Sequence, residues 1–329
     1  MGGLHMVSLP LRPLLASVVD YAGTFPPAGM SLKTAMAAYA TYQKQPEHWL
    51  LGKYVLSVAD LPAFIKELLP RVRLTMGLGK HPSVWPISLV LRDPRYISSS
   101  SLLRSLHFYT ANSYLSIAAL EISPQPRETL ENIVSTVKAQ VPQSVETFFE
   151  VPLTSVSQSS YQDSLRMLQA HRAMAKVRTG GLSPKDFPTV MQLAQFIATC
   201  EQLKLPFKET AGLHQPFYSQ KRLPNGSWVN MHGFFNIAIA TALTHYASLT
   251  AIDITHILQA TSLEDFIPWF DDVLLTELWF DLCQLRKQFF RGFGSCSFQE
   301  PLASVIQLQR SQTTENATRM LKISNDISA

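Results

Sequence analysis

Two matching stretches decide the fold: AKVRTGG at residues 175–181 and PFKETAG at residues 206–212. Each is a short strand-like run that ends in glycine, and each carries a lysine, Lys176 in the first and Lys208 in the second. Helical spacing of apolar residues fills the segment Asp186 to Leu203 between them. The sequence therefore predicts a strand–helix–strand unit with a lysine near the end of each strand.

Outward from this unit, strand-like runs alternate with helical patterns along most of the chain. Near-continuous apolar strands alternating with amphipathic helices are typical of parallel βα units. The expected strands are Leu14–Val19, Trp49–Ser57, Pro86–Arg92, Leu115–Ile122, Glu146–Val151, Ala173–Arg178, Phe207–Thr210 and Phe293–Phe298. The expected helices are Leu32–Lys44 capped by Ser31, Asp60–Leu69, Ser101–Asn112, Arg127–Gln140, Tyr161–His171, Asp186–Leu203 and Pro301–Gln309.

The number of repeating units selects the architecture. Eight βα units close a barrel of about 250 residues before insertions. We therefore predict a single (β/α)8 TIM-type barrel over residues 1–310, with a helical insertion at about 248–291 before the last strand and a flexible tail at 311–329. The long connection Leu213–Met231, with a Pro-Asn-Gly turn, would lie on the catalytic side. A doubly wound open sheet is the competing architecture, and only the eightfold count favours the barrel.

Composition narrows the class of protein. The 329 residues are 46% hydrophobic and 16% charged, which allows a large core. The net charge of +4 forms no basic run, which argues against nucleic-acid binding, and no apolar run reaches the roughly 18 residues of a membrane span. Three cysteines without a CxxC pattern fit a reducing compartment. We expect a cytoplasmic protein that acts on a small anionic molecule, and a homo-oligomer remains open.

Charged residues close several of the expected strands. In a parallel barrel the chemistry lies at the carboxyl ends of the strands. The charged residues at these ends are Asp20, Arg92, Glu121, Glu150, Lys176, Arg178 and Lys208. Salt bridges at the barrel rim are the alternative reading, but buried ion pairs contribute little to stability, so convergent acids and bases favour a site.

The two lysines predict a covalent mechanism. Neighbouring ammonium groups repel and burial disfavours charge, so one amine would have a lowered pKa and become a nucleophile. Lys176 is the candidate nucleophile that forms a Schiff base with a carbonyl carbon, and Lys208 would lower its pKa. Glu121, Glu150 or Asp20 would move the protons, and no cofactor is expected. The alternative is that Lys176 binds an anion and never reacts.

Glycine and serine residues follow the same strands. Backbone N–H groups in such turns, and at the helix N-termini that follow, can hold a phosphate or carboxylate group. The candidate anion-binding residues are Arg178, Gly180, Gly181, Gly212, His214, Gly294, Ser295 and Ser297. Ordinary turns at the start of helices are the alternative reading of the glycines.

In these motifs the chain resembles the class I aldolases, in particular the deoxyribose-phosphate aldolase family. The similar stretches are KVRTG at 176–180, FKETAG at 207–212 and FGSCS at 293–297, and Asp20 matches an aspartate that ends the first strand of that family. The resemblance implies a Schiff-base role for Lys176, a tuning role for Lys208 and phosphate contacts near Gly180, Gly212, Gly294 and Ser297. The chain also resembles a group of uncharacterised bacterial proteins with KxRTGG, KxTAGLHxP and FGSCSF stretches, which implies no activity.

Three positions depart from the aldolase pattern. The proton-relay aspartate of strand four has no counterpart in LSIAALEI, so Glu121 would have to substitute for it. Cys296 stands where a phosphate-binding serine is expected, and Arg178 places a bulky charge in the turn after Lys176.

Together these features predict an aldolase- or lyase-like enzyme acting through a lysine Schiff base on a small carbonyl substrate with an anionic group. One alternative is a metal-dependent barrel hydrolase or lyase that uses Glu121, Glu150 and His214. No HxH or HExxH spacing supports that alternative, and we expect no bound metal. Another alternative is a non-catalytic barrel that binds a ligand or acts as a scaffold.

Overall fold

The computed structural model describes residues 11–77, 84–92, 115–123, 127–154, 157–269 and 274–310. The expected helix Ser101–Asn112 and the expected tail at 311–329 lie outside these residues. No helix in the described ranges combines the length and the apolar character needed to cross a bilayer.

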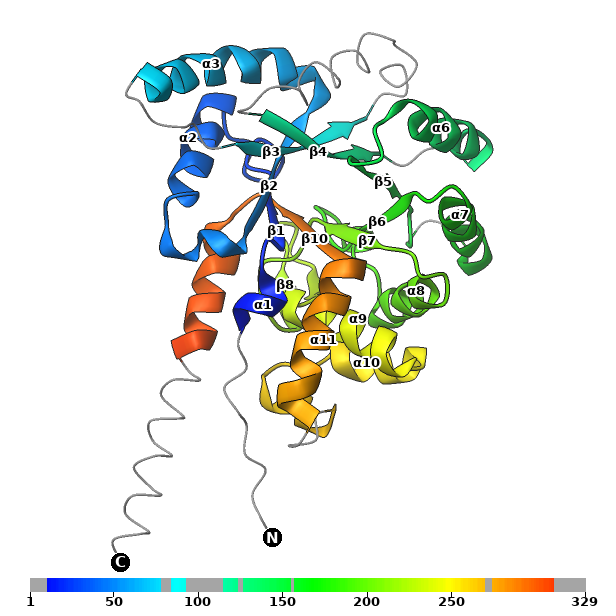
Figure 1. The fold of residues 1–329 in the computed structure, drawn as a ribbon. Helices are drawn as coiled ribbons and strands as arrows, with labels where there is room; N and C mark the ends of the chain where they lie inside the picture. The colour runs from blue at the N-terminus through cyan, green and yellow to red at the C-terminus, as the bar shows by residue number, and fades with distance from the viewer. Residues whose placement is uncertain are drawn as a thin grey trace, which may run out of the picture.

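Eight parallel strands close into one barrel, which confirms the predicted (β/α)8 fold and rules out the open sheet. Around the barrel the strands follow the order β1-β10-β7-β6-β5-β4-β3-β2. Figure 1 shows these strands at the centre of the molecule with helices arranged around them. The barrel strands are β1 Val19–Tyr21, β2 Leu51–Ser57, β3 Trp85–Leu91, β4 Leu115–Ile122, β5 Glu146–Glu150, β6 Met174–Arg178, β7 Phe207–Thr210 and β10 Phe290–Ser295.

Most helices that follow the strands agree with the amphipathic patterns in the sequence. They are α2 Leu32–Tyr42, α3 Leu61–Gly77, α6 Arg127–Gln140, α7 Gln158–Ala170, α8 Val190–Gln202 and a last helix at 299–310. Helix α9 Phe234–Ala247 was not among the predicted helices, and it is buried on all sides from Phe234 to Thr244. Ser31 caps α2 as expected, since its hydroxyl accepts a hydrogen bond from the Thr34 N–H at 3.2 Å. Helix α8 begins only at Val190, because Pro188 interrupts the segment predicted to be helical from Asp186.

The predicted first strand, Leu14–Val19, is wrong except at its last residue. Residues Leu11–Leu15 form a short helix, α1, and the strand begins only at Val19. Pro13 is tolerated because it lies in the first turn of this helix, where its missing N–H has no intrahelical partner to lose. Because β1 still ends beside Asp20, the error does not move that carboxylate away from the carboxyl end of the barrel.

The long connection after β7 contains a hairpin that the sequence reading missed. Strands β8 Ser219–Arg222 and β9 Trp228–Met231 pair in antiparallel fashion outside the barrel. The Pro-Asn-Gly turn joins them, with Gly226 at φ 86°. The strands were missed because Ser219–Arg222 is polar, so it has no apolar alternation to mark it.

The segment before the last strand contains the predicted helical insertion. It holds α10 Ala251–Leu258, a 3-10 helix η4 at Glu264–Trp269 and α11 Leu274–Phe289. Strand β10 follows α11 directly, so it starts and ends about three residues earlier than predicted. The predicted end was too late because Ser297 already caps the last helix, accepting a hydrogen bond from the Glu300 N–H at 3.3 Å.

Apolar side chains fill the space between the strands and the surrounding helices. Phe207 of β7 packs edge to face against Phe196 of α8, with ring centroids 5.1 Å apart. Because successive side chains of a strand point to opposite faces, the neighbouring Lys208 points into the barrel. A TIM-barrel interior usually holds Val, Ile and Leu. In this barrel charged side chains occupy much of that interior.

Candidate active site

Four adjacent strands and β1 bring the five predicted catalytic residues together inside the barrel. In the parallel register, Glu150 of β5 pairs with Lys176 of β6, and Lys176 pairs with Lys208 of β7. Glu121 comes from β4 and Asp20 from β1. All five are buried. The residues that the sequence analysis grouped because they lie at strand ends are thus brought together by the fold.

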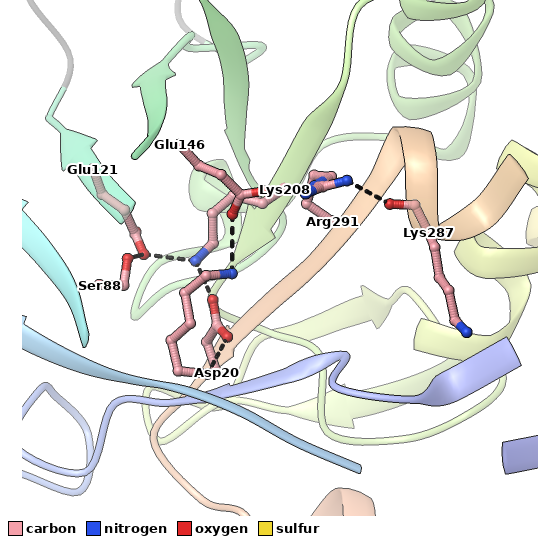
Figure 2. Close-up of polar contacts among 8 residues, drawn as sticks. Asp20, Ser88, Glu121, Glu146, Lys208, Lys287 and Arg291 are labelled. Carbon is pink, nitrogen blue, oxygen red and sulfur yellow. Dashed lines mark hydrogen bonds and ion pairs between the residues drawn. The ribbon is translucent and has the colours of Figure 1, made fainter. Parts of the chain in front are cut away.

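The inner part of the site is a lysine held by two carboxylates. The Lys208 Nζ lies 2.6 Å from Asp20 Oδ2 and 2.6 Å from Glu121 Oε1. Figure 2 shows this amine between the two acids, with Ser88 beside Glu121. The Ser88 hydroxyl donates to Glu121 Oε1 at 2.6 Å, and the backbone N–H of Lys53 donates to Asp20 Oδ1 at 2.7 Å. Both acids are therefore held in fixed orientations.

Electrostatics in this cluster fix its protonation states. Burial alone would raise the pKa of Glu121, but the ammonium groups of Lys208 and Lys176 outweigh burial and hold its pKa far below the usual range. Burial alone would lower the pKa of Lys208, but Asp20 and Glu121 outweigh burial and raise it above its usual value. Lys208 is thus a permanent cation and Glu121 a permanent anion near neutral pH.

The outer part of the site is the second lysine, Lys176. Its Nζ lies 3.0 Å from Glu121 Oε2 and 3.1 Å from Glu150 Oε2, and its side chain is 5% exposed. The two oxygens of Glu121 therefore hold one lysine each. The sequence-based argument relied on direct repulsion between the amines, and it is incomplete because Glu121 lies between them. Arg178 Nε approaches Glu150 Oε1 at 3.4 Å with half of its side chain exposed.

A cavity of about 430 Å³ opens over Lys176 at the carboxyl end of the barrel. Aromatic and apolar groups, including Phe25, Val55 and Val90, cover part of its wall. The predicted site residues that line it are Glu121, Glu150, Lys176, Arg178, Gly181, Gly212, His214, Gly294 and Ser295. Lys208 and Asp20 lie beneath this lining, behind Glu121. Lys176 is therefore the amine that a small molecule in the cavity would reach.

Two of the predicted phosphate-binding residues, Gly180 and Ser297, have structural roles and do not line the cavity. A Cβ added to Gly180 would lie 2.7 Å from the Gly212 Cα, so these glycines let the turns after β6 and β7 pack backbone against backbone. Gly212 also has φ 83°, a conformation that favours glycine. Ser297 caps the last helix. Gly181, Gly294 and Ser295 lie on the wall of the cavity, but the Ser295 hydroxyl already donates to the Ser297 carbonyl at 2.7 Å.

The predicted histidine lies at the edge of the cavity and turns toward the last helix. His214 Nδ1 lies 2.9 Å from Glu300 Oε2. Burial lowers the pKa of His214 more than Glu300 raises it, so the imidazole is neutral at pH 7. The metal hypothesis grouped His214 with Glu121 and Glu150, but no set of three such side chains among the described residues could hold an ion. The oxygens of both acids contact lysine amines instead.

Charged residues continue below the site toward the amino end of the barrel. Lys53 Nζ lies 3.1 Å from Glu146 Oε2, and Arg291 Nε donates to Glu146 Oε1 at 2.6 Å. Glu146 and Glu150 lie four residues apart on β5, which is roughly 13 Å along a strand. Figure 2 labels Glu146 and Arg291, which the hydrogen bond from Arg291 Nε joins. Ion pairs thus run through most of the barrel interior.

The sequence contained a signal for one of the residues that were missed. Ser88 is a polar residue within an otherwise apolar strand, and its hydroxyl donates to Glu121. A polar side chain inside such a run is costly to bury without a partner, so this position could have been added to the site. Lys53 bonds to Asp20 through its backbone N–H, so its side chain gave no signal for that contact. Lys221 also lines the cavity, but it lies on the unpredicted hairpin and no strand-end rule points to it.

Comparison with known proteins adds no family to this description. No protein-family model matches the chain, and no curated protein matches it either. The function is therefore argued from the geometry of the site.

Proposed function

We propose that this protein is a lyase that forms a Schiff base between Lys176 and the carbonyl carbon of a small anionic substrate, and then cleaves or forms a carbon–carbon bond. The observation that carries the proposal is the position of the Lys176 amine. It lies at the floor of the cavity, nearly excluded from solvent, between the carboxylates of Glu121 and Glu150.

These two carboxylates would have different roles in the reaction. Glu121 is held as an anion by Lys208 and Lys176, so it is a poor proton carrier near neutral pH. Glu150 contacts Lys176 and also lines the cavity, which makes it the residue that takes a proton from the ammonium group and returns it to substrate. This division supports Glu150 as the general acid–base residue.

The bond changes follow from the chemistry of an amine. The neutral amine of Lys176 adds to the carbonyl carbon, and the resulting carbinolamine loses water to give a protonated imine. The imine accepts the electron pair of the breaking carbon–carbon bond, while Glu150 removes the proton from the hydroxyl group on the leaving carbon. Protonation of the enamine and addition of water then release the second product and the free amine.

The rest of the cavity suits the anionic part of such a substrate. Arg178 reaches from the end of β6 with half of its side chain exposed, and Arg92 at the end of β3 is also on the wall of the cavity. The guanidinium group of Arg92 lies over the Phe25 ring, 5.5 Å from its centroid. A phosphate or carboxylate group between these side chains would be paired by an arginine in the manner that such groups prefer.

Borohydride trapping tests the proposal directly. Purified protein is mixed with glyceraldehyde 3-phosphate, pyruvate or acetaldehyde, reduced with sodium borohydride and digested, and the peptides are read by mass spectrometry. We expect an irreversible adduct on the Lys176 peptide. The matched variant is Lys176→Arg, which keeps a positive charge between the two acids but cannot form an imine.

Absence of an adduct across this panel, or an adduct of equal yield in Lys176→Arg, would overturn the Schiff-base proposal. If an anion binds in the cavity but no compound of the panel forms an adduct, the result would instead support the non-catalytic alternative, in which Lys176 only binds the anion.

A further inference from the structure

A second cavity, larger than the first, lies on the outer side of the His214 loop. Its volume is about 710 Å³. Its wall comes from the connection after β7, strand β8, the turn before η4 and the last helix at 299–310. We call it the annex cavity. None of the predicted catalytic residues lines it, so it is a separate space that the proposed chemistry leaves unexplained.

The two cavities share a wall. His214, Lys221 and Met231 line both of them. Met231 is buried at the base of the hairpin, whereas His214 meets Glu300, an exposed residue on the other side of the annex cavity. These three residues therefore form the partition between the two cavities.

Charge differs between the two spaces. The wall of the first cavity carries Arg92 and Arg178 in addition to Lys176. The annex wall carries Lys221 against two acids, Glu264 and Glu300. With His214 neutral the annex has a net negative balance, which disfavours an anionic group there.

Uncharged hydrogen-bonding groups make up much of the remaining annex wall. Its hydroxyl and amide side chains include Gln215, Ser219, Ser262 and Ser304. The Ser304 hydroxyl donates to Gln215 Oε1 at 3.3 Å, so these two form one edge of the wall. Side chains of this type both donate and accept, as alcohol groups of a ligand do. Polar groups that converge in a concave space are the usual mark of a binding site.

We propose that the annex cavity binds an uncharged, hydroxyl-bearing chain, and that the substrate of the proposed lyase extends from Lys176 past His214 into it. The second part rests on the proposed function, whereas the first does not. The substrate would then be longer than the first cavity alone admits, with its carbonyl carbon at Lys176, its anionic group near Arg178 and its hydroxylated end beside Ser304.

Binding of sorbitol tests the annex cavity without any chemistry. Saturation transfer from protein to sorbitol is measured by NMR for the full chain and for Ser304→Trp and Gln307→Trp, which place an indole in the annex. We expect transfer to the natural protein and a loss of about tenfold in affinity in both variants. Ala303→Trp is the matched control, because Ala303 is exposed on the same helix and lines neither cavity.

No transfer to sorbitol, or equal binding by all variants, would overturn the annex site. Tighter binding of glucosamine than of sorbitol would overturn its assignment to an uncharged chain. Two variants are used so that a folding failure in one, detected by circular dichroism, leaves the other to decide.

The extension of the substrate is tested by borohydride labelling of Lys176 with glycolaldehyde, which fits within the first cavity, and with maltotriose, an aldehyde-bearing sugar long enough to extend from Lys176 into the annex. We expect the ratio of maltotriose to glycolaldehyde labelling to fall about tenfold in Ser304→Trp. An unchanged ratio would overturn the extension. Sorbitol binding without labelling by either aldehyde would retain the annex site, refute the extension into it and count against the Schiff base.

Discussion

The substitution Lys208→Met tests whether the charged interior of the barrel is a tightly coupled unit. Methionine keeps the length of the side chain and removes only the ammonium group. In the natural protein that group lies 2.6 Å from both Asp20 Oδ2 and Glu121 Oε1 and is 1% exposed. Its loss leaves two buried carboxylates without their shared cation.

The expected cost follows from known behaviour of buried pairs. Removing one partner of a buried ion pair destabilises a protein by about 3–5 kcal/mol, because the remaining charge has no compensation. For Lys208→Met we expect a loss near the upper end of that range, since two acids lose one partner. Ser88 and the Lys53 N–H still donate to these acids, which keeps the loss from exceeding the range.

The penalty should depend on pH with a definite sign. The lowered pKa of Glu121 gives the natural protein stability that is present above the unfolded value of about 4.5 and is lost as pH falls toward the folded value. The raised pKa of Lys208 gives stability that is complete below about 10.5 and is lost at higher pH. The penalty of Lys208→Met should therefore be constant from about pH 6 to 9 and shrink below about pH 5, where Glu121 can protonate in the variant.

Urea unfolding followed by circular dichroism, at neutral pH and at pH 4.5, measures both quantities. Lys185→Met is the matched control, because Lys185 is exposed and should change stability by no more than about 0.5 kcal/mol. A penalty below about 1 kcal/mol at neutral pH, the range of exposed pairs, would refute the argument. So would a penalty that stays the same at both pH values.

Three further predictions address other parts of the molecule. Glu150→Gln should slow borohydride labelling of Lys176 by about 10²–10⁴-fold while leaving the labelled position unchanged, and a rate equal to that of the natural protein would remove Glu150 from proton transfer. Glu209 of β7 is fully buried, and burial raises its pKa far above the usual value, so the stability that its proton provides at low pH is lost as pH rises above about 4.5. The melting temperature of Glu209→Gln relative to the natural protein should therefore increase from pH 5 to pH 8 in differential scanning calorimetry, and a constant difference would contradict the assignment. Gly180→Ala should lower stability by about 1–3 kcal/mol in urea unfolding, since its new methyl group would press on the Gly212 backbone, and an unchanged midpoint would show that the turn can move.

The ion pairs inside the barrel contribute less to stability than an apolar core would. Buried ion pairs usually add little net stability compared with apolar side chains of the same volume. A barrel that places Lys53, Glu146 and Arg291 below Lys208 forgoes the usual Val, Ile and Leu layers. Net stability therefore does not account for the charged residues of this core.

The sequence by itself determined the fold and much of the candidate site. Parallel strands of a barrel are buried on both faces, so their apolar runs stand out, and β4 and β7 match their predicted bounds. The carboxyl ends of parallel strands meet at one end of a barrel, so the rule that charged strand ends converge brought Asp20, Glu121 and the two lysines together without coordinates.

Only the tertiary structure decided which groups touch and which space they face. The Glu121 carboxylate separates Lys176 from Lys208, and this depends on distances across the barrel that no local pattern encodes. The hairpin that carries Lys221 and the annex cavity arise from segments far apart in the chain, whose polar residues have no periodic signal. Periodicity reports which face of an element is buried, whereas contacts between elements depend on how the closed barrel brings its strands and loops together.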